Sequence, residues 1–204
     1  MAEKSIYLAS RSPRRRELLK QIGVDFEMLL LRSDPRRGVD VDESPISGEP
    51  AHDYAVRIAT MKADVGMRAV AMRGLRTKPV LTADTTVVLR DEIIGKPQDR
   101  EDAVRILTAL SGSEHQVISV VAMAHREQVE YRVSTSTVWF RALTLDEVRR
   151  YAETGEPLDK AGAYGIQGRA GMFVTRIEGS YSGIMGLPLA ETAELMQKFG
   201  IALL

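Results

Sequence analysis

The chain alternates between short dense runs of apolar residues and longer stretches in which apolar residues recur every three or four positions. The dense run at residues 6–9 predicts a strand. The pair Ser12-Pro13 then predicts the start of a helix, because serine is a favoured N-cap and proline fits the first helical position. This helix is expected to end at Gly23.

The same alternation continues to the end of the chain. Residues 32–50 are rich in proline, glycine and acids, which predicts an exposed loop, and the spacing from Ala51 toward Ala69 predicts a long helix. Further apolar runs, caps and turns predict strands at 80–89 and 172–177, a β-hairpin of 116–124 with 129–140, and helices capped at Asp99 and Thr144 or ending at Phe199. Strands and helices that alternate around a long antiparallel hairpin predict an α/β protein with a mixed sheet.

Composition narrows the class of protein. With 204 residues, 44% of them hydrophobic, the chain is expected to form one domain over residues 1–204. The 28 basic residues balance 28 acidic ones and only 5% of residues are aromatic, which disfavours a nucleic-acid partner. Without cysteine, disulfides and thiolate sites are excluded. Because no apolar run suits a membrane span or a signal peptide, we expect a cytoplasmic protein with no membrane partner.

A few charged residues interrupt apolar patterns. Asp84 lies in the apolar strand 80–89, where a carboxylate is costly unless it is paired or binds a metal. It is either a strand-end aspartate bonded to a loop, or a metal ligand or general base. Lys62 lies on the apolar helix stripe and can extend to solvent. Lys96 is a turn lysine or a phosphate ligand, and Glu43 in its polar loop is by default a solvated acid.

Arginines crowd the predicted start of the first helix, at positions 11, 14, 15 and 16. A helix N-terminus favours anions, so each exposed arginine there is opposed by about 0.3–1 kcal/mol. The cluster is a solvated basic patch, a contact for nucleic-acid phosphates, or a site for a compact polyphosphate. A polyphosphate would relieve both the conflict with the helix dipole and the mutual repulsion of the arginines.

Taken in order, the motifs of this chain resemble those of the Maf family of nucleoside triphosphate pyrophosphatases, also called septum formation proteins. The matching segments are "LASRSPRRRELL" at 8–19, "DES" at 42–44, "MKA" at 61–63, "ADTTV" at 83–87, "IIGKPQD" at 93–99, "LSGSEHQV" at 110–117, "GEPLDKAGAYGIQG" at 155–168 and "GSYSGIMGLPL" at 179–189. The resemblance implies a mixed twisted sheet flanked by helices, two lobes with a central cleft, a fold related to that of inosine triphosphate pyrophosphatases, and a homodimer. Residues 159–168 resemble the subgroup that acts on dTTP and UTP.

The resemblance also implies roles for individual residues. Asp84 matches the proton acceptor, and the positions linked to substrate specificity are Arg14, Thr85 and Gln167. The phosphate-binding positions are Ser10, Ser12, Arg15, Lys62 and Lys96. A divalent cation, Mg²⁺ or Mn²⁺, is implied, and Asp84 with Glu43 can supply the carboxylate oxygens that such an ion prefers. The residues alone leave open whether Asp84 binds the metal, deprotonates the attacking water or orients it.

The resulting hypothesis is an enzyme that hydrolyses dTTP and UTP to the monophosphate and pyrophosphate, with modified pyrimidine nucleotides as further candidate substrates. Gln167 carries an amide donor and an acceptor, which can match the imide edge of uracil or thymine. The alternative hypothesis is a nucleotide-binding regulator of cell division or septum formation whose hydrolysis is incidental. The two differ in whether bound nucleotide is converted to pyrophosphate.

Overall fold

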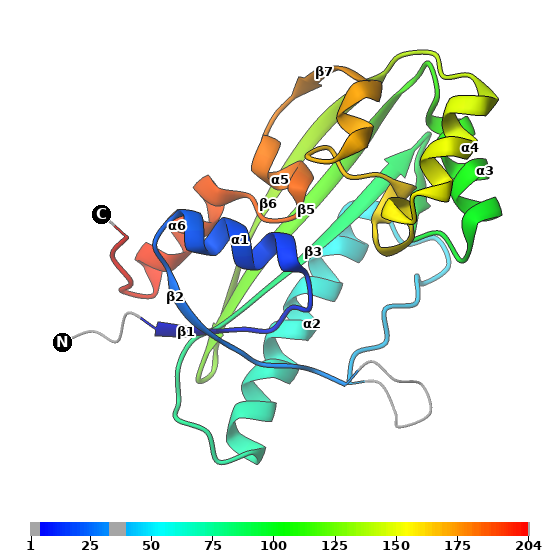
Figure 1. Cartoon of the computed structure of the whole chain (residues 1–204). Helices are drawn as coiled ribbons and strands as arrows, with labels where there is room; N and C mark the ends of the chain where they lie inside the picture. Colours follow the sequence, from blue (N-terminus) through cyan, green and yellow to red (C-terminus); the bar gives the residue numbers. More distant parts are fainter. Residues whose placement is uncertain (1–4, 33–39, 204) are drawn as a thin grey trace.

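The computed structural model describes residues 5–32 and 40–203, so part of the predicted loop 32–50 lies outside the described residues. A seven-stranded mixed sheet runs through this part of the chain, with strand order β2-β1-β3-β5-β6-β7 and β4 paired to β3. Helix α2 covers one face of the sheet, while α1, α5 and α6 lie on the other (Figure 1). The predicted mixed α/β fold is therefore confirmed, and the single domain over residues 1–204 stays a prediction.

The elements largely follow the predicted ones. The strands are β1 Ser5–Leu8, β2 Asp25–Met28, β3 Val80–Leu89, β4 Glu92–Ile94, β5 Glu114–His125, β6 Gln128–Phe140 and β7 Val174–Glu178. The α-helices are α1 Pro13–Gln21, α2 Ala51–Met72, α3 Arg100–Leu110, α4 Leu145–Glu153, α5 Tyr181–Met185 and α6 Leu189–Lys198. Three 3-10 segments complete the set, η2 Glu156–Asp159, η3 Ala161–Ala163 and η4 Arg169–Phe173.

Several short elements escape the hydrophobic pattern, β2 and α5 among them. Strand β2 is a four-residue edge strand, exposed along most of its length. Helix α5 has five residues and lies inside the stretch that the sequence predicts as a loop. Segments this short contain too few apolar positions to establish a period.

The sheet is open at one place along β3. Strand β1 pairs with β3 only at its beginning, as far as Leu8 opposite Leu81, and β4 pairs with it only from Val87 opposite Ile94. Between these pairings, residues 82–86 have no strand partner on that edge within the described part of the chain. The chain leaves β1 at this point and enters the arginine-rich segment before α1. The opening therefore brings the centre of β3 next to that segment.

Alternation along β3 sends its side chains to two different layers. The Thr82 hydroxyl donates to the Ala59 carbonyl of α2 at 2.8 Å, so the even-numbered residues face α2. Leu81 and Ala83 pack in a core cluster with Leu187 and Leu195, on the α6 side. Asp84 consequently points toward α2 and Thr85 toward the opposite layer.

The structure confirms two of the predicted helix caps and corrects a third. Asp99 accepts a hydrogen bond from the Asp102 amide at 2.8 Å, and Thr144 with Glu147 forms the expected capping box. Ser12 occupies the N-cap position of α1 but its side chain makes no capping hydrogen bond. Its backbone amide instead donates to the Ser10 hydroxyl at 3.2 Å. The prediction of a serine cap was right in position and wrong in contact.

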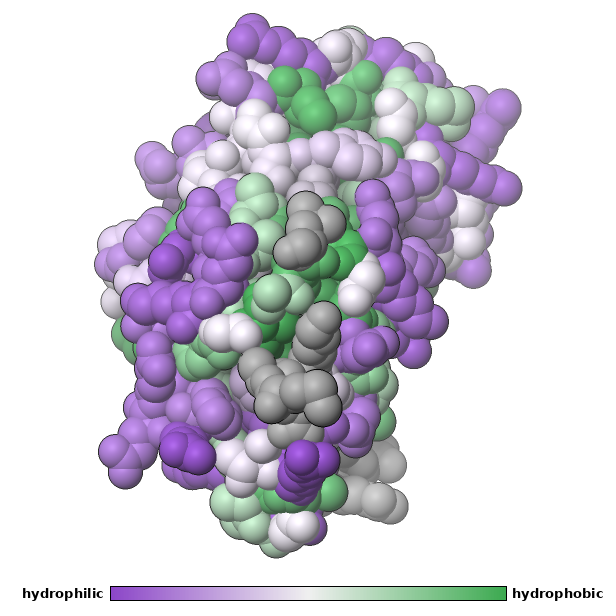
Figure 2. Space-filling view, turned by 90° about the vertical axis from the view of Figure 1, so that its left-hand side faces the viewer, coloured by the Kyte–Doolittle hydropathy of each residue, from purple (hydrophilic) through white to green (hydrophobic). Residues whose placement is uncertain are grey.

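Strand β1 and the segment that follows α6 lie on one side of the molecule (Figure 1). Figure 2 views that side and shows hydrophobic side chains exposed between hydrophilic borders. No helix in residues 5–32 and 40–203 is both long enough and apolar enough to cross a membrane.

Candidate active site

The opening in the sheet lies in a cavity of about 960 Å³. The side of α1 and the loop after β2 form one wall, and the segments around η2, η3 and α5 form the other. Every site residue predicted from the sequence lines this cavity: Ser10, Ser12, Arg14, Arg15, Glu43, Lys62, Asp84, Thr85, Lys96 and Gln167. Residues that span more than 150 positions of the sequence are thus gathered around one space.

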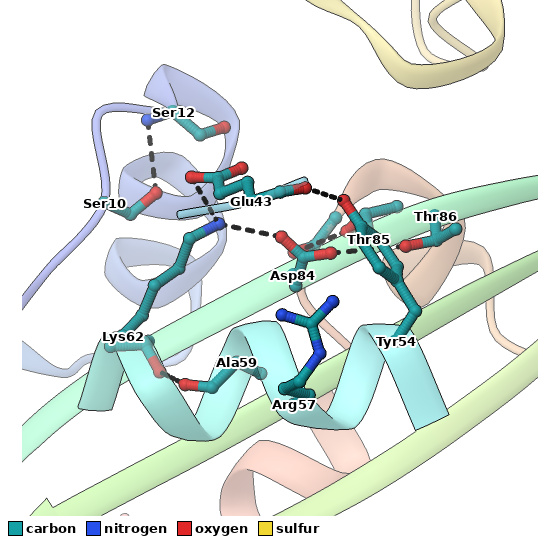
Figure 3. Close-up of polar contacts among 12 residues, drawn as sticks. Ser10, Ser12, Glu43, Tyr54, Arg57, Ala59, Lys62, Asp84, Thr85 and Thr86 are labelled. Atoms are coloured by element: carbon teal, nitrogen blue, oxygen red, sulfur yellow. Dashed lines mark hydrogen bonds and ion pairs between the residues drawn. The ribbon is translucent and has the colours of Figure 1, made fainter. Parts of the chain in front are cut away.

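A chain of charges crosses the floor of the cavity. Lys62 Nζ lies 2.8 Å from Asp84 Oδ1 and 3.1 Å from Glu43 Oε1 (Figure 3). The Thr86 hydroxyl donates to the other Asp84 oxygen at 3.2 Å. Lys62 therefore does not simply extend to solvent. It joins the strand carboxylate to the loop carboxylate, and the carboxylate expected to be costly on β3 is paired.

The loop that carries Glu43 is held by α2. The Tyr54 hydroxyl donates to the Glu43 carbonyl at 3.0 Å (Figure 3). Arg57 donates to both carboxylate oxygens of Glu49 at 2.6 Å and to the Ser44 carbonyl at 3.1 Å. Burial, followed by the nearby charges of Asp84 and Glu43, raises the pKa of Tyr54 to about 12, so its hydroxyl remains a donor.

Sequence reasoning missed Tyr54 and Arg57. Tyr54 fits the apolar spacing that predicts the long helix from Ala51, and Arg57 lies on the same helix without interrupting that spacing. The available signal is their spacing: Tyr54 and Arg57 are three residues apart, which makes them neighbours on the surface of α2, and Lys62 follows Tyr54 by eight residues, about two turns along the helix.

Arg15 occupies the junction between the two walls. Its guanidinium donates to the Gly186 carbonyl at 2.8 Å, and to the hydroxyls of Ser10 and Thr85 at 3.2 Å each. Some of its surface remains accessible, yet protein surrounds the group closely, and this burial is the main cause that lowers its pKa. The Thr85 hydroxyl also accepts from Ser119 at 3.1 Å. Ser10, Arg15 and Thr85 thus bind one another as well as lining the cavity.

Arg14 connects α1 to the opposite wall. Its Nη1 lies 3.3 Å from Asp159 Oδ2, and the Arg14 side chain is only 20% exposed whereas that of Asp159 is 59% exposed. Asp159 also pairs with Lys160 Nζ at 2.5 Å. The conflict between Arg14 and the helix dipole is therefore partly offset by a carboxylate of the protein itself.

The remaining predicted residues lie at the rim. Lys96 and Gln167 are both exposed, and both line the cavity. The Gly162 amide donates to the Gly95 carbonyl at 3.1 Å, which ties the turn before Lys96 to the segment η3. The side chains of Lys96 and Gln167 can therefore contact a bound molecule without disturbing the packing of buried residues.

A cation site in this cavity would rely on two carboxylates. Within the described residues there is no group of three or more His, Cys, Asp and Glu side chains that could hold a metal ion. Asp84 and Glu43 nevertheless direct oxygens at one point, which the Lys62 ammonium occupies at 2.8 and 3.1 Å. Two carboxylates suit Mg²⁺, which commonly retains waters and takes further oxygens from substrate phosphates. The donor set therefore fits a hard divalent cation that a phosphate ligand completes.

Fold and cavity together define a class of protein: a mixed α/β protein with a cleft lined by two carboxylates, Asp84 and Glu43, and by several arginines and lysines. This arrangement is suited to polyphosphate chemistry. The family model described as "Maf-like protein" matches residues 5–199. The chain belongs to the Maf family.

Named relatives align along almost the whole chain. A protein of Aromatoleum aromaticum named dTTP/UTP pyrophosphatase is 55% identical over 199 residues, covering 97% of each chain. Proteins of the same name from Dechloromonas aromatica and Nitrosomonas europaea are 52% and 51% identical, and cover 96% and 97% of this chain and 97% and 95% of their own. Among solved structures, a Ham1 protein of Staphylococcus aureus aligns with 96% of this chain and 97% of its own at a TM-score of 0.47 and 18% identity.

Proposed function

We propose that this protein is a nucleoside triphosphate pyrophosphatase that hydrolyses dTTP and UTP to the monophosphate and pyrophosphate. One observation carries the proposal: Asp84, Lys62 and Glu43 are joined by ion pairs on the floor of the cavity, which Arg14 and Arg15 also line. The relatives at 51–55% identity that bear the name dTTP/UTP pyrophosphatase support the choice of substrate.

The triphosphate is proposed to lie along the cationic side of the cavity. Ser10 and Ser12 lie just before α1, where backbone amides and the helix dipole favour an anion. Lys62 and Lys96 approach from α2 and from the turn after β4. Arg15 contributes its charge while its hydrogen bonds to Ser10, Thr85 and Gly186 keep the loop and the β3 edge together. Positioning and charge neutralisation of this kind supply most of the catalysis in phosphoryl transfer.

Asp84 is proposed to accept the proton of the attacking water. Water adds to the α-phosphorus, the bond from that phosphorus to the oxygen bridging to the β-phosphate breaks, and pyrophosphate leaves. The hydrogen bonds from Lys62 and Thr86 fix both oxygens of Asp84, so the carboxylate is already oriented before substrate binds. Asp84 and Glu43 are the residues that would hold Mg²⁺ or Mn²⁺, which when bound neutralises charge on the phosphate oxygens.

Selection of the base is assigned to the other end of the cavity. Gln167 is uncharged, exposed and part of the lining. Its amide offers donors and an acceptor to the imide edge of thymine or uracil. Arg14 and Thr85 are proposed to contribute to specificity between the phosphate end and this residue.

A panel of nucleotides tests the proposal. The purified protein is incubated with dTTP, UTP, CTP, dATP and GTP in the presence of Mg²⁺ or Mn²⁺, and monophosphate and pyrophosphate are measured. For both dTTP and UTP, we expect one pyrophosphate to be released for each monophosphate. Without the cation, we expect neither product. Tight binding of UTP with no pyrophosphate would instead favour a nucleotide-binding regulator of cell division. Orthophosphate as the released product would contradict cleavage next to the α-phosphate.

Two further expectations accompany this function as proposals. A homodimer is expected from the resemblance to the family, and sedimentation of the purified protein measures it. A cytoplasmic location is expected because the proposed substrates are intracellular nucleotides, and fractionation of cells tests it.

A further inference from the structure

The residue proposed to read the base stands on a short turn. The Gly168 amide donates to the Gly165 carbonyl at 2.9 Å, and this hydrogen bond closes the turn around Gln167. The side chain of Gln167 is exposed at the cavity, so its position depends on the backbone beneath it. What holds the two ends of the turn therefore determines where the amide group lies.

Both ends of this turn are bound to one carboxylate that lies outside the cavity lining. Glu156 Oε1 accepts from the Tyr151 hydroxyl at 2.8 Å, and the same hydroxyl oxygen accepts from the Gly165 amide at 3.3 Å. Glu156 Oε2 accepts from the Arg169 amide at 3.3 Å. The carboxylate thus reaches the start of the turn through Tyr151 and its end directly.

The side chains of Glu156 and Lys160 pack closely against the two glycines of the turn. A Cβ added at Gly168 would overlap the Glu156 carboxylate, and one added at Gly165 would lie 2.8 Å from Lys160 Cε. The Lys160 ammonium in turn donates to the Glu156 carbonyl. Burial, and then the contact with Glu156, raises the pKa of the Tyr151 hydroxyl, which stays protonated and remains a donor.

A fixed turn matters because of the chemistry of a glutamine amide. Rotating the amide by 180° exchanges its donor and its acceptor, so a loosely held glutamine can match either uracil or cytosine. Uracil presents an imide N–H between two carbonyls, whereas cytosine presents a ring nitrogen acceptor and an amino group. Selection between them needs a glutamine whose place and neighbouring backbone groups are fixed.

We propose that Glu156 is the positioning residue for base selection, holding the turn 165–169 so that Gln167 favours uracil and thymine over cytosine. This inference rests on the proposed function. It separates Glu156 from Asp84, Lys62 and Glu43, because Glu156 acts on the base end of the cavity through the turn and not on the phosphates.

Steady-state kinetics with UTP and CTP test this role. In Glu156→Ala we expect the ratio of kcat/KM for UTP to that for CTP to fall about tenfold, because a site with misplaced hydrogen-bonding groups loses its discrimination. Glu156→Gln keeps the shape and one acceptor but opposes an amide N–H to the Arg169 amide, so an intermediate ratio is expected. Gly168→Ala should reproduce the loss in a chain that retains Glu156, because the added methyl group displaces the carboxylate.

The control is Glu153→Ala, a change of the same kind at the exposed end of α4, and it should keep the wild-type ratio. Thermal melting shows whether each variant is folded. If Glu156→Ala does not fold, Glu156→Gln provides the test. A wild-type ratio in a folded Glu156 variant would overturn the inference, as would an equal loss for both nucleotides. A wild-type protein that cleaves CTP as well as UTP would overturn the proposed substrate selection and this inference together.

Discussion

The ammonium group of Lys62 and the carboxylate of Asp84 meet at 2.8 Å across the interface of α2 and β3, with both side chains largely shielded from solvent at 16% and 12% exposure. A charge pair in such a place strongly destabilises the protein when one partner is removed, because the other is left without compensation. A substitution that retains shape and hydrogen bonding is therefore needed to separate catalysis from folding.

Asp84→Asn provides that separation. The asparagine carbonyl can still accept from Lys62, and its amide nitrogen can donate to the Thr86 hydroxyl in place of the second carboxylate oxygen. Because an amide is a far weaker proton acceptor than a carboxylate, we expect pyrophosphate release to fall by a factor of about 10³ or more. Circular dichroism should retain the wild-type spectrum. Asp64→Asn, on the exposed side of α2, is the matched control and should keep full activity. Wild-type turnover in Asp84→Asn would remove Asp84 from the mechanism.

Glu49→Gln tests whether α2 positions Glu43 for a metal ion. The change breaks the charged pairing of Arg57 with Glu49 and loosens the loop that carries Glu43. We expect the Mg²⁺ concentration for half-maximal activity to rise about tenfold, as for other groups that orient a metal ligand, with less effect on the rate at saturating Mg²⁺. Arg68→Gln breaks an exposed pair on the same helix and should leave the Mg²⁺ dependence unchanged. An unaltered Mg²⁺ dependence in Glu49→Gln would argue against this positioning.

Arg14 and Asp159 test the contact between the two walls. Because the pair is partly exposed, its loss should change the free energy of unfolding by no more than about 1 kcal/mol. We therefore expect Arg14→Ala to raise KM or alter base preference in a protein of nearly wild-type stability. Asp159→Asn, which frees Arg14 for the substrate, should lower KM. If Arg14→Ala retains the wild-type KM and substrate profile, Arg14 serves only the contact with Asp159 and not the substrate.

His115 predicts an acid-sensitive fold. It is 2% exposed, its Nε2 lies 2.8 Å from the Tyr164 hydroxyl, and burial lowers its pKa to about 4. Below about pH 6.5 the unfolded chain binds a proton at this residue that the folded chain does not, so stability falls as the pH drops from about 6.5 toward 4. Between pH 6.5 and pH values below 4, the free energy of unfolding is expected to fall by about 3 kcal/mol because of this residue.

Urea unfolding between pH 7.5 and pH 4.5 measures this dependence. His115→Leu should be less stable at neutral pH yet lose less stability on acidification than the wild type. His52→Leu, at an exposed position, should follow the wild-type curve. Parallel curves for His115→Leu and the wild type would show that other groups cause the acid sensitivity.

Local physical chemistry accounts for the parts of the fold that the sequence predicted. The boundaries of β3 follow directly from the apolar run at 80–89, and Asp99 and the pair Thr144 and Glu147 cap their helices as expected. These features depend on neighbours within a few residues, so a single sequence contains all the information that they need. The motif set likewise selected residues that the structure places around one cavity.

The partner of each charged group depends on tertiary packing. Lys62 could have extended to solvent, but the packing of α2 on β3, and of the loop 42–49 on α2, brings Asp84 and Glu43 to its ammonium group. Arg14 finds Asp159, 145 residues away, and Glu156 holds a turn from outside the cavity. Such contacts depend on how segments that are distant in sequence pack against one another. The longer helices and strands and the chemical groups available to the site can thus be predicted from the amino-acid sequence, whereas the packing of the sheet against α2 and α1 determines how those groups are paired.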